Sequence, residues 1–433
     1  MKPSFRAAVA LSVILTACAQ PAGPQLPSVT TTDFTAFDGQ QGTLGIRLGH
    51  SRKLSLDAEP HFVTVSPDSQ TAWVTLQNNN AVATVDLASG TVTAMRSLGL
   101  KDHSLPGQGL DASDRDGGVN IQNWPVKGAY MPDHIAHVSL GGRSYLLTAN
   151  EGNPVNEGLA TSDAVRVADL TLDPAVFPDA ASLQADSALG RLMVSRPDAD
   201  TNGDGRADQL VAFGARSVSV WDTDLNLVAD TGDAIERDLA TRTPGTFNSE
   251  GTASSFDDRS DDRGPEPEGV TTGVIGGRTL AFVSLERAGG VMVFDLSDPA
   301  HPAVVDSAHF GDPTAAPDSG NAGDLQPDDM LFIAGANSPS GQPLLIVSSE
   351  VSGSVTLYTV QNSGTLSFTG RYQTSPYAYG VGVGAMSAYD QTRGRLLMVN
   401  RATSSLDVLD IRDVTRPVLS GKLSLAAYGR TPT

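Results

Sequence analysis

The sequence has few of the features that stabilise or localise many other proteins. It contains a single cysteine, Cys18, so no disulfide can form within the chain. Charged residues make up only 18%, and 29 Lys and Arg stand against 49 Asp and Glu, which gives a formal net charge of −20. Nucleic acids and anionic membrane surfaces repel a chain with this balance, so we expect no nucleic-acid partner. Cations are the favoured small partners, unless the charge serves only to keep an exported protein soluble.

Long helical patterns and membrane-spanning runs are also scarce. Apart from a short N-terminal segment, no apolar run is long enough to cross a bilayer. Runs of Leu, Glu and Lys that favour helices are rare, whereas the 433 residues include 44 Gly and 26 Pro. A hydrophobic share of 39% is enough for a large core. This composition predicts an all-β protein with many turns.

The N-terminal segment has the pattern of an export signal. Basic Lys2 and Arg6 precede an apolar run over 7–15, which is too short to remain as a spanning helix. The run ends in Leu-Thr-Ala-Cys, which resembles a bacterial lipobox, where the cysteine is diacylated and becomes the new N-terminus. We expect a signal peptide over 1–17, then the lipidated Cys18 and a flexible tether over 18–32.

An ordinary cleaved leader with an incidental cysteine is the alternative. The residue after the cysteine is Ala19, not the Asp that retains some lipoproteins in the inner membrane. This favours the outer membrane or the cell surface of a bacterium. We therefore expect an exported protein that is anchored in the cell envelope and meets the membrane through its N-terminal lipid only.

One strand pattern recurs along the chain. Alternating apolar residues, mostly ending in Asp, predict half-buried strands, and each copy follows another strand across a polar or Gly-rich turn, as in a β-hairpin. The copies are VATVDL (82–87), VRVADL (165–170), VSVWDT (218–223), VMVFDL (291–296), VTLYTV (355–360) and LDVLDI (406–411). A third strand, which begins with Pro and one or two polar residues, precedes several hairpins.

The repeated order of three strands predicts a β-propeller over 33–433. The first unit, PHFVTVSPDSQTAWVTLQNNNAVATVDL, resembles the YVTN type of WD40-like repeat. We expect one propeller of four-stranded blades, with seven blades or six, in which 43–56 and 416–429 close the ring. Two β-sandwich domains are the rival interpretation; they account for the strands but not for their repeated order.

Acidic residues recur at two places of each predicted blade. In a propeller, the loop that leads into the first strand and the end of the second strand lie on the same face, around the central channel. These positions hold Glu59, His61, Asp133, His134, Glu266, Glu268, Asp328 and Asp329 before the first strands, and Gln77, Asn150, Glu151, Glu286, Glu350 and Arg401 after the second strands. We therefore predict an acidic channel mouth, with His61, Asp133 and Asp328 among its binding residues.

Such a mouth can hold a divalent cation, because carboxylate oxygens suit Ca²⁺ and Mg²⁺. Crowded carboxylates also repel one another, which raises the pKa of some of them. The alternative is a hydrated rim that Arg259, Arg263 and Arg287 neutralise.

A second acidic pattern predicts a structural calcium site. In DADTNGDGRAD, side-chain oxygens alternate and a glycine allows a sharp turn. The expected ligands are Asp200, Asn202, Asp204, the carbonyl of Arg206, and Asp208. The terminal Glu of an EF-hand is replaced by Val211, and the spacing resembles the shorter loops of dockerin and integrin-like calcium repeats. A turn without metal is the alternative.

Long segments resemble the choice-of-anchor I family, a group of secreted bacterial β-propellers similar to the mesenchyme-specific cell surface glycoprotein. The resemblance covers about 43–425. It is carried by YLLTANEG, DGRADQLVAFGARSVSVWD, FNSEGTASSFDDRSDDRGPEPEGV, AFVSLERAGGVMVFDLSDPAHP and LLIVSSEVSGSVTLY. The chain departs from the family pattern at Asn153, after TANEG, and at QPDDM (326–330).

The resemblance also implies a candidate activity, because some relatives are labelled alkaline phosphatase or phytase-like. A calcium-dependent phosphoesterase would hold metal on carboxylates and phosphate on arginines. The candidate residues are Glu151, Glu266, Glu268, Glu286, Arg287 and Glu350. The other hypothesis is a binding module for an envelope protein or a small polar ligand, and the sequence leaves open whether the protein is an enzyme.

Overall fold

The computed structural model describes residues 29–49, 53–155, 162–374, 377, 379–380 and 387–426. The expected signal peptide, Cys18 and the first part of the tether lie outside these residues. None of the helices in the described part is long and apolar enough to span a membrane.

Most strands belong to five four-stranded antiparallel sheets, which we call blades 1 to 5. Blade 1 contains β1 (Pro60–Val65), β2 (Thr71–Leu76), β3 (Ala81–Asp86) and β4 (Thr91–Ser97), and blade 2 contains β7 (Ile135–Leu140), β8 (Arg143–Ala149), β12 (Val218–Asp222) and β13 (Leu227–Asp230). Blade 3 contains β14 (Pro267–Ile275), β15 (Arg278–Leu285), β16 (Val291–Asp295) and β17 (Ala303–Ala308), and blade 4 contains β18 (Pro327–Ile333), β19 (Leu344–Ser349), β20 (Ser354–Val360) and β21 (Leu366–Gln373). Blade 5 contains β22 (Ser387–Asp390), β23 (Arg395–Asn400), β24 (Ser405–Asp410) and β25 (Val418–Ser424).

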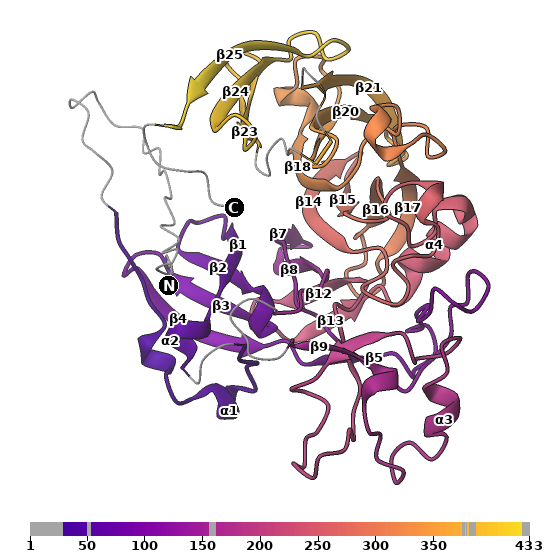
Figure 1. Ribbon diagram of the computed structural model, residues 1–433. Coiled ribbons are helices and arrows are strands. Elements are labelled where there is room, and N and C mark those ends of the chain that lie inside the picture. Colours follow the sequence, from indigo (N-terminus) through magenta and orange to yellow (C-terminus); the bar gives the residue numbers. More distant parts are fainter. Residues whose placement is uncertain are drawn as a thin grey trace.

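The blades follow one another around a common centre, which makes the chain an all-β propeller (Figure 1). The first strand of each blade is the innermost, and β1, β7, β14, β18 and β22 contact one another in this order. Among the described residues, no strand pairing joins blade 5 to blade 1. The number of blades in the ring, seven or six, therefore stays a prediction.

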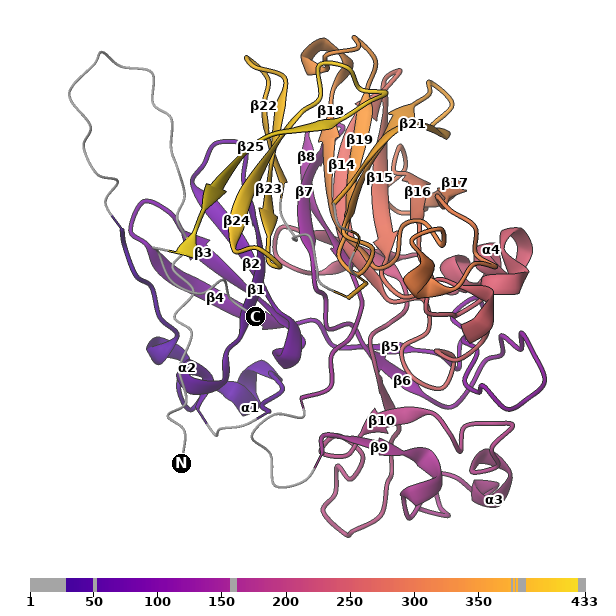
Figure 2. The same cartoon turned by 45° about the horizontal axis from the view of Figure 1, so that its top comes forward.

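A sixth sheet lies beside the ring (Figure 2). This insert sheet has the order β5-β6-β11-β10-β9. Its strands are β5 (Leu100–Asp102), β6 (Lys127–Ala129), β9 (Ala164–Arg166), β10 (Met193–Ser195) and β11 (Val211–Phe213). The pairing of β6 with β11 is parallel, whereas the other strand pairings of the insert sheet are antiparallel.

The insert sheet corrects two sequence predictions. The segment 165–170 is not the third strand of a blade, because β9 pairs with β10 in the insert sheet. The third strand of blade 2 is instead β12, which pairs with β8 across an insertion. Alternating apolar residues identify a strand but not the strand with which it pairs. Because of the long insertion, the segment 165–170 is nearer to β8 in the sequence than its true partner β12 is.

The prediction that residues 43–56 form a strand that closes the ring was also wrong. Within 43–56 the described residues form helical turns rather than a strand, whereas the tail forms β25 inside blade 5. The α-helices are α1 (Gln41–Leu44), α2 (Leu54–Asp57), α3 (Ala180–Leu183) and α4 (Ala234–Arg242). The 3-10 helices are η1 (Thr35–Phe37), η2 (Gln77–Asn79), η3 (Val167–Asp169), η4 (Pro244–Thr246), η5 (Ala253–Ser255), η6 (Pro317–Ser319) and η7 (Gly335–Asn337).

Buried side chains between neighbouring blades hold the ring together. Phe282 of blade 3 stacks on Phe332 of blade 4, with ring centroids 5.6 Å apart. The inner strands approach closely at Gly269, where a Cβ atom would lie 2.3 Å from the carbonyl oxygen of Asp328. The Ser284 hydroxyl donates a hydrogen bond of 2.9 Å to this same carbonyl. The start of one inner strand is thus positioned against the next, which matters for the site at the centre.

Candidate functional site

A proline lies at or just before the start of the first strand in each of blades 1 to 4. In blades 2, 3 and 4 the residue before this proline has a left-handed backbone. Met131, Glu266 and Gln326 have φ angles of 42°, 52° and 52°. Non-glycine residues seldom adopt this region, and its cost is tolerated where the surrounding structure enforces it. The same uncommon turn therefore introduces blades 2, 3 and 4.

A register shift follows the proline in three blades. The pairing of the first two strands is irregular between Pro60 and Val63, between Pro267 and Val270, and between Pro327 and Met330. Such bulges redirect side chains that strict alternation would place elsewhere. The residues directly after the four prolines are His61, Asp133, Glu268 and Asp328, and all four line one cavity.

The ends of the second strands reach the same cavity. The backbone N–H of Glu286 donates to the carbonyl of Glu266 at 2.8 Å, and that of Glu350 donates to Gln326 at 2.7 Å. These bonds place the end of each second strand beside the start of the first. The cavity-lining residues at this position are Gln77, Glu151, Glu286, Glu350 and Arg401.

The cavity measures about 540 Å³ and receives side chains from all five blades. Its remaining lining residues are Phe62, His134, Asn153, Arg263, Arg287, Asp329 and Val399. Three residues predicted for the mouth lie elsewhere. Glu59 is exposed and bonds to Asn78, Asn150 is buried against Ser217 and Ser219, and Glu266 is fully buried outside the lining.

The sequence reasoning missed the two apolar lining residues, Phe62 and Val399. A signal for Phe62 was present, because it occupies the position of His134 and Asp329, the second residue after the proline. The Phe62 ring lies against the His134 imidazole, with centroids 3.8 Å apart.

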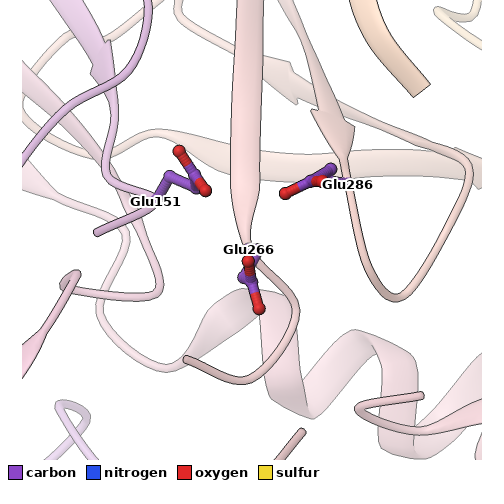
Figure 3. Close-up of side chains that lie close together, drawn as sticks. All are labelled: Glu151, Glu266 and Glu286. Carbon is purple, nitrogen blue, oxygen red and sulfur yellow. The ribbon is translucent and has the colours of Figure 1, made fainter. Parts of the chain in front are cut away.

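Three glutamates converge near the cavity (Figure 3). Glu151, Glu266 and Glu286 each offer a carboxylate oxygen, and these oxygens lie within 4.8 Å of one another. Within the described part of the chain, this is the one group of three or more His, Cys, Asp or Glu side chains with such convergence. It is therefore the candidate place for a divalent metal ion.

Guanidinium groups already contact this triad. Arg263 reaches Glu151 at 2.5 Å and Glu266 at 2.6 Å, and Arg287 lies 3.2 Å from Glu286 and 3.5 Å from Glu266. Arg259 contacts Glu266 from a further side. Burial costs charged groups much less when they are paired in this way.

Two histidines flank one aspartate of the cavity lining. His134 Nδ1 lies 2.5 Å from one carboxylate oxygen of Asp133, and His61 Nδ1 lies 3.2 Å from the other. Gln77 Nε2 donates to Asp133 at 3.4 Å and to Glu151 at 2.6 Å, so it links this aspartate to the glutamate triad. The buried Nε2 atom of His134 has no hydrogen-bond partner and lies 3.9 Å from Asp329.

Two carboxyl groups of the cavity have no directly bonded partner in the described part of the chain, although the charge of His134 acts on Asp328. Among the described residues, no ion pair or side-chain hydrogen bond involves the carboxylate of Glu268 or Asp328. The Glu268 Oε2 atom is buried without a partner, and Asp328 is only 6% exposed. By contrast, Arg401 pairs with Glu350. The carboxyl groups without an ion pair therefore lie at the starts of blades 3 and 4.

Burial and mutual repulsion shift the pKa values of these acids upward. Burial, and then the charges of Glu286 and Asp328, raise the pKa of Glu268 well above its usual range. The pKa of Glu286 is raised likewise, by burial and then by Glu151 and Glu266. Burial also raises the pKa of Glu151 and that of Asp328 to about 7, although Arg263 and His134 respectively oppose the shift.

The histidine pair behaves differently. Burial lowers the pKa of His61, but its hydrogen bond to Asp133 and the charges of the acids around it together outweigh this and raise the value to about 9. The pKa of His134 is raised for the same reason. The pKa of Asp133 falls, because the two histidines outweigh its burial. Near neutral pH His61 is therefore a cation beside the Asp133 carboxylate.

The predicted calcium loop lies in the insert sheet, between β10 and β11. Asp200 accepts bonds from the backbone N–H groups of Gly203 at 2.7 Å and Gly205 at 2.8 Å. Asn202 accepts from Asp204 at 2.9 Å, and Asp204 accepts from Arg206 at 2.9 Å. The loop is thus curled by its own side-chain oxygens. Asp208 bonds to the Thr201 hydroxyl at 2.7 Å and closes the curl.

Comparison with known proteins gives a consistent family. The sequence model of the choice-of-anchor I domain matches residues 12–299. Gigasin-3a of Magallana gigas is 32% identical over 192 residues, which are 42% of this chain and 67% of that protein. The mesenchyme-specific cell surface glycoprotein of Strongylocentrotus purpuratus is 27% identical over 314 residues, 63% of this chain and 39% of that protein. The matched part thus spans well under half of the sea-urchin glycoprotein.

Solved structures are more distant. A protein from Lactobacillus plantarum has a TM-score of 0.44 at 12% identity, over 84% of this chain and 71% of its own. A putative 6-phosphogluconolactonase from Bacteroides uniformis has a TM-score of 0.42 at 13% identity, with the same two coverages. The Dos1 propeller has a TM-score of 0.40 at 9% identity, over 86% and 61%.

The raised pKa values predict that the ligand-free protein loses stability as pH increases. A carboxyl whose folded pKa lies above its unfolded value stabilises the fold below the unfolded pKa, and this contribution is lost as pH rises through the folded pKa. For Glu151 and Asp328 that window runs from about pH 4 to 7, and His61 acts in the same direction up to about pH 9. We expect Tm to fall by roughly 2–5 °C between pH 5.5 and 8.5.

Differential scanning fluorimetry in a metal-free buffer measures this change. The Glu151→Gln/Asp328→Asn double variant removes two carboxyls whose pKa lies near 7, inside this window, and should show a flatter profile. A wild-type Tm that rises steadily across this window would contradict the assignment of these pKa shifts.

Proposed function

The chain belongs to the choice-of-anchor I family, and from this membership we propose a cell-surface-associated β-propeller that binds a ligand at its central cavity. The sea-urchin relative is named as a cell surface glycoprotein, which supports surface association. The chain carries a lipobox-like ending at Cys18, which supports a lipid as its anchor. The protein would then display its channel mouth from the cell envelope.

The observation that carries the binding role is the pair of unmatched carboxylates in the cavity. Glu268 and Asp328 face a space of about 540 Å³, which lies in the range of roughly 300–1,000 Å³ typical of small-molecule sites. Buried acids without partners are costly, so a cation that enters the cavity gains their interaction. We infer that the bound ligand is cationic, or carries cationic groups.

A cation screen tests this function. We expect at least one of Ca²⁺, Mg²⁺ and spermidine to raise Tm at pH 8, where the cavity acids are more fully ionised, and to do so less at pH 5.5. The Glu268→Gln/Glu286→Gln variant should lose most of this increase. Glu59→Gln is the matched control, because Glu59 is exposed outside the cavity. If no cation stabilises the wild type more than this double variant, the cavity is not a cation site.

Hydrolysis of phosphate esters is the second candidate. The presence of Arg263, Arg287 and Arg401 at the cavity supports it, because phosphate needs basic partners. All three are ion-paired with glutamates, which makes them less available to a phosphate and ranks this function second. In the same preparations, turnover of p-nitrophenyl phosphate with Ca²⁺ that is lost in Glu268→Gln would place hydrolysis first.

We also propose that the 200–208 loop binds Ca²⁺ in a structural role. Its alternating oxygens and two glycines with positive φ support this, since a chelating loop needs both. Removal of calcium with EDTA should lower Tm by a few degrees in the wild type, as measured by fluorimetry with and without added Ca²⁺. Asp200→Asn should lower the starting Tm and remove the EDTA effect. A wild-type Tm that EDTA leaves unmoved means that the loop is empty.

The lipid anchor has its own test. Replacing Cys18 with Ser removes the atom that would be acylated, so the variant should move from the membrane pellet to the soluble fraction in a bacterial host. Wild type should incorporate labelled palmitate, and the variant should not. A Cys18→Ser protein that still pellets with membranes would contradict a lipid anchor.

A further inference from the structure

The distribution of charge in the central cavity also indicates which cation it takes. The class of ligand is inferred here on the basis of the proposed cation-binding function. Two arrangements are possible in principle: acids that converge on a single point, as around a metal ion, or acids that are spread along the walls, as around an extended organic cation.

The one convergent group is poorly suited to a metal ion. Ca²⁺ takes about six to eight oxygen ligands and is repelled by neighbouring cations. In the triad of Glu151, Glu266 and Glu286, Arg263 bridges the first two carboxylates and Arg287 contacts the last two. A divalent ion among these oxygens would lie against two guanidinium groups and would have to compete with them for the same oxygens.

The remaining acidic groups come from two different blades. Once the ion pairs are counted, Glu268 on blade 3 and Asp328 on blade 4 carry the unmatched charge. Each carboxylate can accept hydrogen bonds from one ammonium group. The two residues begin the inner strands of neighbouring blades and lie outside the convergent triad, so an extended cation can present one ammonium group to each.

The walls also offer apolar surface. Phe62 and Val399 line the cavity together with the acids. A bare metal ion gains nothing from such surface, whereas the methylene groups of an alkylamine are removed from water against it. An aromatic ring also attracts an ammonium group that lies over its face.

We propose that the cavity binds an organic cation with two or more alkylammonium groups, held by Glu268 and Asp328. The ligand would be a free oligoamine or the lysine side chains of a peptide, which share this chemistry. Arg401 offers a sharper test, because its removal would free Glu350 and add a third unmatched carboxylate to the cavity.

Isothermal titration calorimetry of the purified protein at pH 8, without metal, tests the proposal with spermidine, with a terminally blocked Lys-Lys dipeptide, and with Ca²⁺. We expect at least one of the two amines to bind more tightly than Ca²⁺. Glu268→Gln and Asp328→Asn should each weaken that amine by roughly tenfold, since each removes a charged acceptor. Arg401→Gln should strengthen it by about two- to fivefold, and Glu59→Gln should leave it unchanged.

The possible outcomes distinguish a wrong ligand class from the absence of a cation site. Spermidine binding without dipeptide binding supports a free oligoamine, and dipeptide binding supports lysine side chains. Ca²⁺ that binds more tightly than both amines and depends on Glu268 overturns the inference but leaves a cation site. Absence of any binding overturns both. Amine affinity that neither Glu268→Gln nor Asp328→Asn changes, in variants with a wild-type circular dichroism spectrum, also overturns the inference.

Discussion

A single buried carboxylate connects the elements on which the central site depends. Glu266 is fully buried and has a left-handed backbone, and its side chain is contacted by Arg259, Arg263 and Arg287. Its backbone carbonyl also accepts the N–H of Glu286. Burial of an unpaired carboxylate costs much free energy, so the fold is stable only with the arginines close to Glu266. The loop that supplies two of them is thereby fixed beneath the propeller.

This arrangement explains why the cavity keeps carboxyl groups that no arginine pairs with. The arginines are engaged with Glu266 and with its neighbours Glu151 and Glu286, so they leave Glu268 and Asp328 unmatched. The strained turns before the prolines and the register shifts behind them direct these side chains inward. Strain and uncompensated charge in one place are typical of sites that act on a ligand rather than of sites that only stabilise a fold.

The fold could be predicted in outline because propeller strands repeat. The strand pattern and its order identified the propeller, and the proline-led starts together with the second-strand ends identified most of the side chains that meet at the cavity. The assignment of 165–170 to a blade was wrong, because the insert sheet uses the same alternating pattern. The closing role of 43–56 failed for a similar reason, since short apolar stretches also suit helical turns.

The sequence by itself determined the class of fold, the excess of negative charge and the positions at which acidic residues recur. These properties follow from composition and from local periodicity, which need no knowledge of distant contacts. Only the tertiary structure decided which acids are neutralised, because an ion pair such as Arg263 with Glu151 joins residues far apart in the chain. It also decided that Glu268 and Asp328 stay unmatched, since the charge of a site depends on which side chains reach each other in space.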